Sequence, residues 1–138
     1  MYFGTIFAIL GLAESKEKMT VLSHILVVDD DPGVCDVIRH LLEDNGYRVS
    51  IARDGVAMRH IIGDEAVDLA IVDAAMPGES GASLALHAAD IGVKVIMMTG
   101  DPTQRESVED SDFPFILKPF HIADLLQLVT GVLQEATG

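Results

Sequence analysis

The chain has 138 residues, of which 49% are hydrophobic, a composition that favours one globular domain and disfavours disorder. Its formal net charge at pH 7 is −13, and its nine Lys and Arg residues are scattered. Because no basic stripe is available to neutralise phosphates, direct nucleic-acid binding is disfavoured, and proteins or cations are the expected partners. The single cysteine, Cys35, allows no internal disulfide, fits a reducing cytoplasm, and is expected in the core.

The first thirteen residues, MYFGTIFAILGLA, form an apolar run that stands apart from the rest of the chain. The run is shorter than the about 20 residues of a membrane span. Its first basic residue is Lys16, so it also lacks the basic start of a secretory signal. We interpret residues 1–20 as an apolar extension of unknown role, ahead of a domain over residues 21–138. An amphipathic or dimer-forming helix is the next interpretation, and a cleaved signal or membrane anchor the least favoured.

Short runs rich in Val and Ile alternate with helical stretches after residue 24. Most of these runs are apolar throughout, which is typical of parallel strands buried on both faces. Strands are predicted over residues 24–28, 47–52, 68–72, 93–98 and 113–117. Helices are predicted over residues 32–45, 55–63, 81–90, 102–110 and 121–135. This alternation predicts an α/β fold, a five-stranded parallel sheet covered on both faces by five helices, with no second domain and no output module after the last helix.

Two of these helices carry further signals. Asn45-Gly46 is expected to end the first helix with a left-handed residue. The 102–110 helix is weak, because its segment has almost no apolar residue beyond Val108. The five histidines lack the spacing of metal ligands and are interpreted as surface or helix residues: His24, His40, His60, His87 and His121.

Polar side chains follow four of the predicted strands, where each strand ends. They are Asp29, Asp30 and Asp31 after the first strand, then Asp73, Thr99 and Lys118. Ligands of parallel α/β sheets bind beyond the carboxyl ends of the strands, so these side chains are expected to meet at one edge. Carboxylates suit Mg²⁺ (or Mn²⁺), and a cation would relieve their mutual repulsion. Asp73 would then attack phosphorus as a nucleophile, while Lys118 and Thr99 stabilise the transferred charge. Arg53 and Asp54, after the second strand, are interpreted as loop surface.

Four motifs, VVDDDP, AIVDAAMPGESG, VIMMTG and FILKPF, resemble in order and spacing the signatures of the response regulator receiver domain. The resemblance covers residues 24–135. It implies a flavodoxin-like, doubly wound sheet of strand order 2-1-3-4-5 in three αβα layers. It also implies Mg²⁺-dependent phosphoryl transfer from a histidine kinase phosphohistidine to Asp73. The aspartyl phosphate would switch protein–protein interactions in a two-component pathway or phosphorelay, and the protein would not be a turnover enzyme.

The resemblance assigns roles to individual positions. Asp73 is the phosphorylated nucleophile, and Lys118 contacts the phosphoryl group. Asp30 and Asp73 are direct metal ligands, Asp29 acts through water, and Ala75 offers its backbone carbonyl.

Thr99 matches the switch hydroxyl, and Phe115 stands at the switch aromatic position, where tyrosine is more common. Gly100 follows Thr99 where alanine is usual, which is expected to loosen the neighbouring loop. The Lys118–Pro119 bond is expected to be cis. Asp31 has no family role and is predicted to cap the first helix.

The implied partners are a sensor histidine kinase or phosphotransfer protein and a downstream protein target, in the cytoplasm and without a membrane span. The sequence does not distinguish a phosphate sink, a relay and a direct effector, and it is compatible with a homodimer. One alternative is a haloacid-dehalogenase-like phosphatase using the D-x-D pair Asp29 and Asp31. That reading places Gly33 where Thr or Val is usual, finds no acidic pair after Lys118, and leaves Asp73 unexplained. The other alternative is a receiver-like binding module that is not phosphorylated.

Overall fold

The computed structural model describes residues 22–101, 103–104, 108 and 111–135. Its strands are β3 (His24–Val28), β4 (Arg48–Ala52), β5 (Leu69–Asp73), β6 (Lys94–Thr99) and β7 (Phe115–Leu117). Its helices are α2 (Pro32–Asp44), α3 (Gly55–Asp64), α4 (Gly81–Asp90) and α6 (Ile122–Gln134). The strands form one parallel sheet in the order β4-β3-β5-β6-β7. In chain order this is 2-1-3-4-5, which confirms the predicted fold.

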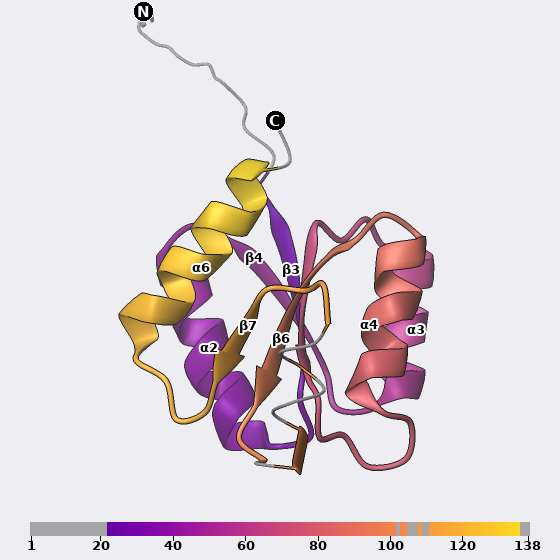
Figure 1. The fold of residues 1–138 in the computed structure, drawn as a ribbon. Coiled ribbons are helices and arrows are strands. Elements are labelled where there is room, and N and C mark those ends of the chain that lie inside the picture. Colours follow the sequence, from indigo (N-terminus) through magenta and orange to yellow (C-terminus); the bar gives the residue numbers. More distant parts are fainter. Residues whose placement is uncertain (1–21, 102, 105–107, 109–110, 136–138) are drawn as a thin grey trace, which may run out of the picture.

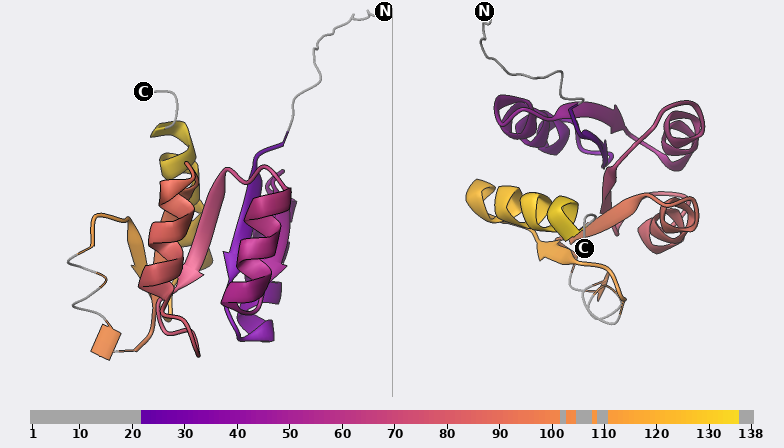
Figure 2. Two further views of the ribbon diagram at one scale, coloured as in Figure 1. Left: turned by 90° about the vertical axis from the view of Figure 1, so that its right-hand side faces the viewer. Right: turned by 90° about the horizontal axis from the view of Figure 1, so that it is seen from above.

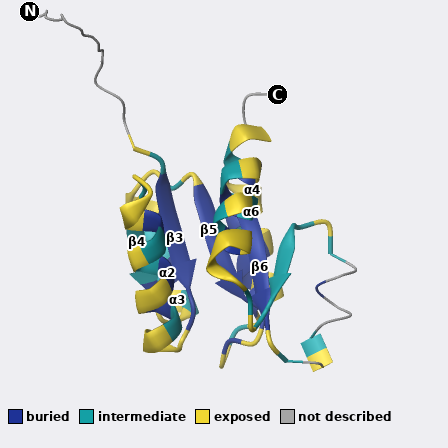
Figure 3. Cartoon of the chain, turned by 90° about the vertical axis from the view of Figure 1, so that its left-hand side faces the viewer, coloured by how far each residue is buried: buried dark blue, intermediate teal, exposed yellow. Residues whose placement is uncertain are grey.

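The helices cover both faces of the sheet. Helices α2 and α6 lie on one face and α3 and α4 on the other (Figures 1 and 2), giving the three expected layers. The central strands are buried while the outer sides of the helices are exposed (Figure 3). No helix in the described part of the chain is long and apolar enough to cross a membrane.

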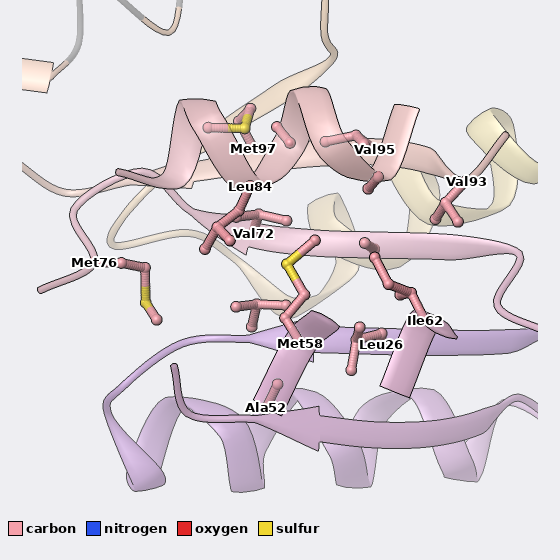
Figure 4. Packing of buried hydrophobic residues seen from close by; sticks show 14 of the residues in the cluster. Leu26, Ala52, Met58, Ile62, Val72, Met76, Leu84, Val93, Val95 and Met97 are labelled. Carbon is pink, nitrogen blue, oxygen red and sulfur yellow. The ribbon is translucent and has the colours of Figure 1, made fainter. Parts of the chain in front are cut away.

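Each face of the sheet has its own hydrophobic core. Leu26 and Val28 of β3 pack toward α3 and α4, around Met58 and Leu84 (Figure 4). The residues between them in the strand, Ile25 and Val27, belong to the core beneath α2 and α6. All four strand residues are 0% exposed. Because successive side chains of a strand point to opposite faces, burial of both faces requires an unbroken apolar run.

The predicted elements are confirmed with shifts of one or two residues at their ends. Strand β7 is shorter than predicted because its pairing with β6 begins only at Phe115. Of the predicted 102–110 helix, Thr103, Gln104 and Val108 have helical backbone, and the rest lies outside the described residues. Val108 is 3% exposed, so it is a buried apolar anchor of that segment. The 1–20 extension also lies outside the described residues.

Caps define where the first two helices begin and end. The Asp31 carboxylate accepts hydrogen bonds from the Gly33 and Val34 amides, at 2.8 and 3.4 Å, which confirms its predicted capping role. Gly46 supplies the left-handed residue after α2, with a φ of 89°. Asp54 accepts a 2.8 Å hydrogen bond from the Ala57 amide, so it caps α3 and is more than the loop-surface residue we expected.

One histidine differs from its interpretation. His24 lies on β3 and is 2% exposed, so it is neither a surface nor a helix residue. Its Nδ1 lies 2.9 Å from the Ala66 carbonyl oxygen and its Nε2 2.7 Å from Ser50 Oγ. These partners satisfy both ring nitrogens, which makes burial of the imidazole tolerable. Cys35 is buried as predicted.

Candidate functional site

Polar side chains gather at the carboxyl edge of the sheet. Asp29 follows β3, Asp73 ends β5, Thr99 ends β6 and Lys118 follows β7. Asp29, Asp73 and Thr99 are only 0%, 5% and 1% exposed. Strands β3 and β5 are neighbours in parallel register, with Val28 opposite Val72, so the residues that follow them are brought side by side. Burial of charged groups is costly unless they are paired or bind metal.

Three carboxylates form the centre of the site. Asp29, Asp30 and Asp73 each offer an oxygen, and these oxygens lie within 4.8 Å of one another. Asp30 is exposed and the other two are buried, so the cluster opens to solvent on the Asp30 side. The third aspartate of the run, Asp31, instead caps α2. The D-x-D pair Asp29 and Asp31 is therefore not the pair that the fold assembles, which disfavours the phosphatase alternative.

Lys118 bridges the two buried carboxylates. Its Nζ donates to Asp29 Oδ2 at 2.7 Å and to Asp73 Oδ2 at 3.4 Å. The other oxygen of each acid is held by a local backbone amide: Asp31 N–H donates to Asp29 Oδ1 at 2.9 Å, and Ala75 N–H to Asp73 Oδ1 at 3.0 Å. Each carboxylate is thus fixed at one oxygen and directed into the site with the other.

The backbone around Lys118 fixes where its side chain begins. The Lys118–Pro119 bond is cis, as predicted, and the Lys118 amide donates to the Thr99 carbonyl oxygen at 2.7 Å. A Cβ on Gly100 would lie 3.0 Å from Lys118 Cβ, so glycine allows a close approach here. Gly100 was expected to loosen the neighbouring loop, but in the structure it packs tightly against the aliphatic part of the Lys118 side chain.

The environment of the site raises the pKa values of both Asp73 and Lys118. Burial raises the pKa of Asp73, reinforced by the Asp29 charge and opposed by the Ala75 amide and Lys118. Burial works against the charged form of Lys118, but its hydrogen bond to Asp29 and the charges of both acids outweigh that effect and raise its pKa. With all acids ionised, three carboxylates and one ammonium leave two net negative charges. A divalent cation would balance this charge, and oxygen ligands at an open edge fit Mg²⁺.

Thr99 ends β6 at this edge of the sheet, whereas Phe115 begins β7, three residues before Lys118. Thr99 Oγ1 accepts from the Asp101 amide at 3.3 Å and lies 3.4 Å from the Asp101 carbonyl oxygen. Phe115 is partly buried against the core beneath α3 and α4. The structure therefore joins Asp29 and Asp73 through Lys118. The two predicted switch residues have other partners: Thr99 is hydrogen-bonded to Asp101, and Phe115 packs against the core.

Two residues with contacts near the site did not emerge as site candidates from the sequence. Arg53 Nε donates to the Asp30 carbonyl oxygen at 3.4 Å. Its position directly after β4, at the same sheet edge, was an available signal. Glu79, in the segment that leads from Asp73 to α4, accepts hydrogen bonds from Arg59 of α3 and Ser83 of α4. The partner Arg59 is 20 residues away in sequence, so no local pattern indicated this contact.

A parallel sheet of this strand order, with acids at the carboxyl edge of β3 and β5, defines a flavodoxin-like α/β protein with its ligand site where the strand order reverses. The chain belongs to the response regulator receiver domain family, whose model matches residues 25–130.

Among curated relatives, the response regulator MprA of Mycobacterium sp. (strain KMS) is 30% identical over 118 residues, covering 82% of this chain and 51% of MprA. Protein PetR of Rhodobacter capsulatus is 28% identical over 116 residues, covering 81% of this chain and 49% of PetR. The chain thus spans about half the length of these relatives.

Solved structures of response regulators have the same fold as this chain. A CheY-like response regulator receiver domain protein from Methanospirillum hungatei JF-1 superposes with a TM-score of 0.76 at 34% identity, covering 83% of this chain and 96% of that one. The response regulator TrrA of Thermotoga maritima, in complex with Mg²⁺-BeF, has a TM-score of 0.72 at 27% identity, covering 80% and 99%.

Proposed function

We propose that this receiver domain accepts a phosphoryl group on Asp73 from the phosphohistidine of a histidine kinase or phosphotransfer protein, in a Mg²⁺- or Mn²⁺-dependent step. The observation that carries the proposal is the buried pair of carboxylates, Asp29 and Asp73, joined by Lys118 and opening to solvent at Asp30. We propose the cytoplasm as its location and a downstream protein as its target. The domain would cover residues 21–138, with 1–20 as an extension.

The geometry supports Asp73 as the nucleophile. Ala75 N–H holds Asp73 Oδ1, which leaves Oδ2 free of backbone contacts and directed at Lys118. An Asp73 oxygen would form a bond to phosphorus while the phosphorus–nitrogen bond of the donor breaks. The donor imidazole keeps that electron pair and leaves as the neutral ring once it is protonated. Later attack of water on phosphorus would return the carboxylate and release inorganic phosphate.

The other residues would neutralise and orient charge. The Lys118 ammonium lies close enough to Asp73 to meet a phosphoryl oxygen bound there. Asp30, Asp73 and the Ala75 carbonyl would hold the cation directly, and Asp29 would hold it through water. When bound, the cation supplies neutralisation of the charge on the phosphoryl oxygens.

Thr99 and Phe115 would convert the new charge into a conformational change. Thr99 Oγ1 rests on the Asp101 backbone through contacts of 3.3 and 3.4 Å, which are long for hydrogen bonds to a hydroxyl. A phosphoryl oxygen on Asp73 would offer a stronger acceptor and draw the hydroxyl inward. Phe115 would then bury its ring further, shifting a two-state equilibrium that a protein target reads.

Intact mass after incubation with Mg²⁺ and a small phosphoryl donor tests the proposal. The wild type is expected to gain one phosphoryl group that is lost at alkaline pH, and Asp73→Asn is expected to gain none. Asp54→Asn is the matched control, because Asp54 is also an aspartate at this sheet edge but caps α3. Donor turnover that survives Asp73→Asn and is abolished by Asp29→Asn would establish the phosphatase instead. A wild type with neither adduct nor Mg²⁺ binding would be a binding module.

A further inference from the structure

The segment over residues 74–80 connects the nucleophile to α4 and contains the Ala75 carbonyl. Its first half is anchored inward. The Ala74 amide donates to the Met98 carbonyl oxygen at 2.7 Å, and Met76 is 8% exposed in the core beneath α3 and α4 (Figure 4). At Gly78 the chain turns with a φ of 83°, a conformation that glycine adopts readily.

The second half is held by Glu79, whose carboxylate contacts two helices, α3 and α4. Arg59 of α3 donates to Oε2, and Ser83 of α4 donates to the same oxygen at 2.7 Å. Oε1 faces the first turn of α3, where a Cβ on Gly55 would lie 3.2 Å from it. A carboxylate at a helix N-terminus is electrostatically favoured. The hydrogen bonds from Ser83 and then Arg59 also lower the pKa of Glu79, so it is charged at neutral pH.

This arrangement can act on the site through the backbone. Directly after Glu79, Ser80 caps α4 by accepting from the Ser83 amide at 3.1 Å. The next residue, Gly81, donates its amide to the Ala74 carbonyl oxygen at 3.3 Å. Movement of Glu79 would therefore be transmitted within two residues to the backbone that carries Asp73 and Ala75.

We propose that Glu79, which accepts hydrogen bonds from Arg59 and Ser83, is a positioning residue. It holds the 74–80 segment in the geometry needed for divalent cation binding and for phosphorylation at Asp73. The inference rests on the proposed function and names residues that act on that site without touching its reacting atoms. The alternative is that Arg59 and Glu79 form an ordinary surface ion pair, since their side chains are 39% and 35% exposed.

Titrations of Mg²⁺ into the full chain distinguish the positioning role from an ordinary ion pair, because the two predict opposite changes in Mg²⁺ affinity for Arg59→Gln. If the two charges act only through the long-range field, Arg59→Gln removes a positive charge and tightens Mg²⁺ binding, whereas Glu79→Gln weakens it, and the effects add. If the pair positions the segment, both substitutions weaken binding, and the double variant is no weaker than either single. The expected weakening is about threefold to fivefold, which is what an exposed ion pair can supply.

The chain offers a matched control. Arg48 and Glu65 form an ion pair of 2.8 Å with side chains 58% and 37% exposed, near the amino-terminal edge of the sheet. Arg48→Gln makes the same charge change as Arg59→Gln and is expected to leave Mg²⁺ affinity unchanged. Arg59→Lys is expected to restore part of the affinity, and Ser83→Ala, a milder change, to weaken it in the same direction.

The outcomes separate this inference from the function on which it rests. A wild type that binds no Mg²⁺ and forms no adduct refutes the proposed function. A wild type that does both, combined with an Arg59→Gln variant that binds Mg²⁺ as tightly or more tightly, refutes the positioning role alone. Weakened Mg²⁺ binding in both single variants, a slower adduct rate and non-additivity support it. If Arg59→Gln does not fold, the same comparison is made with Ser83→Ala and Glu79→Gln.

Discussion

Substituting Gly81 by alanine is expected to destabilise the protein at the site, because α4 meets the backbone of Asp73 and Ala74 at this glycine. A Cβ there would collide with the Asp73 carbonyl oxygen and lie 2.6 Å from Ala74 Cα, where ordinary contacts begin at 3.4 Å. Relieving the Ala74 contact alone would move the start of α4 by about 0.8 Å against a close-packed core, and the shorter contact with the Asp73 carbonyl oxygen requires more. Overpacking of this kind costs about 1–3 kcal/mol, and α4 contributes the fully buried Leu84, which argues for the upper half of that range.

Urea denaturation followed by circular dichroism measures this cost, with Gly131→Ala as the control. Gly131 is also helical, in α6, but a Cβ there would meet nothing within 4 Å. Alanine at that position is expected to stabilise the protein by about 0.5–1 kcal/mol, because it restricts the unfolded chain and favours the helix. The free energies of unfolding of the two variants should therefore differ by about 2.5–4 kcal/mol, the sum of the cost at Gly81 and the gain at Gly131. Equal stability of the two variants would show that the packing argument at Gly81 is wrong.

Three further predictions concern the acid cluster. Asp31→Ala should lower stability by about 1 kcal/mol through loss of the α2 cap without changing Mg²⁺ affinity, whereas Asp30→Ala should lower Mg²⁺ affinity with little effect on urea midpoint. The pKa of Asp73 is raised in the folded state, so the folded state binds this proton more tightly; stability should fall as pH rises from the ordinary value of 3.8 through the folded pKa. Asp73→Asn should thus exceed the wild type in stability above that window in metal-free buffer, and the opposite order of urea midpoints would contradict the shift. Lys118→Met should cost about 3–5 kcal/mol by leaving Asp29 buried without its cation, and thermal melts should show Mg²⁺ stabilising this variant more than the wild type.

The strands of this domain were predictable because burial on both faces leaves a direct mark on the sequence. The central strands β3 and β5 are buried at every position, so their sequences are apolar throughout apart from the terminal His24 and Asp73. The edge strand β7 is only partly buried and pairs on one side, so its start could not be read from composition. His24 was misread because its burial depends on Ala66 and Ser50, which are 42 and 26 residues away.

The acid cluster was predictable because a parallel sheet places the carboxyl ends of its strands together. The different roles of the adjacent aspartates could also be predicted in part from the sequence. A carboxylate just before a helix is expected to cap it, as Asp31 does. The contact between Arg59 and Glu79 could not be predicted from the sequence, because it joins α3 to the segment before α4, and their separation depends on the packed core. Side-chain direction, such as the turn of Thr99 toward Asp101, likewise requires the folded loop.

Both ends of the described chain leave the domain at the edge of the sheet farthest from the aspartates. The N-terminal and C-terminal ends of the described chain lie on the same side of the domain (Figure 1). Ser23, just before β3, and Leu133, near the end of α6, line the same small cavity. A fluorescent label, an affinity tag or a surface linkage attached at either end would therefore leave the acidic face accessible. This arrangement makes the domain well suited to immobilised assays, in which a phosphodonor protein is passed over tethered molecules and transfer is followed without steric interference.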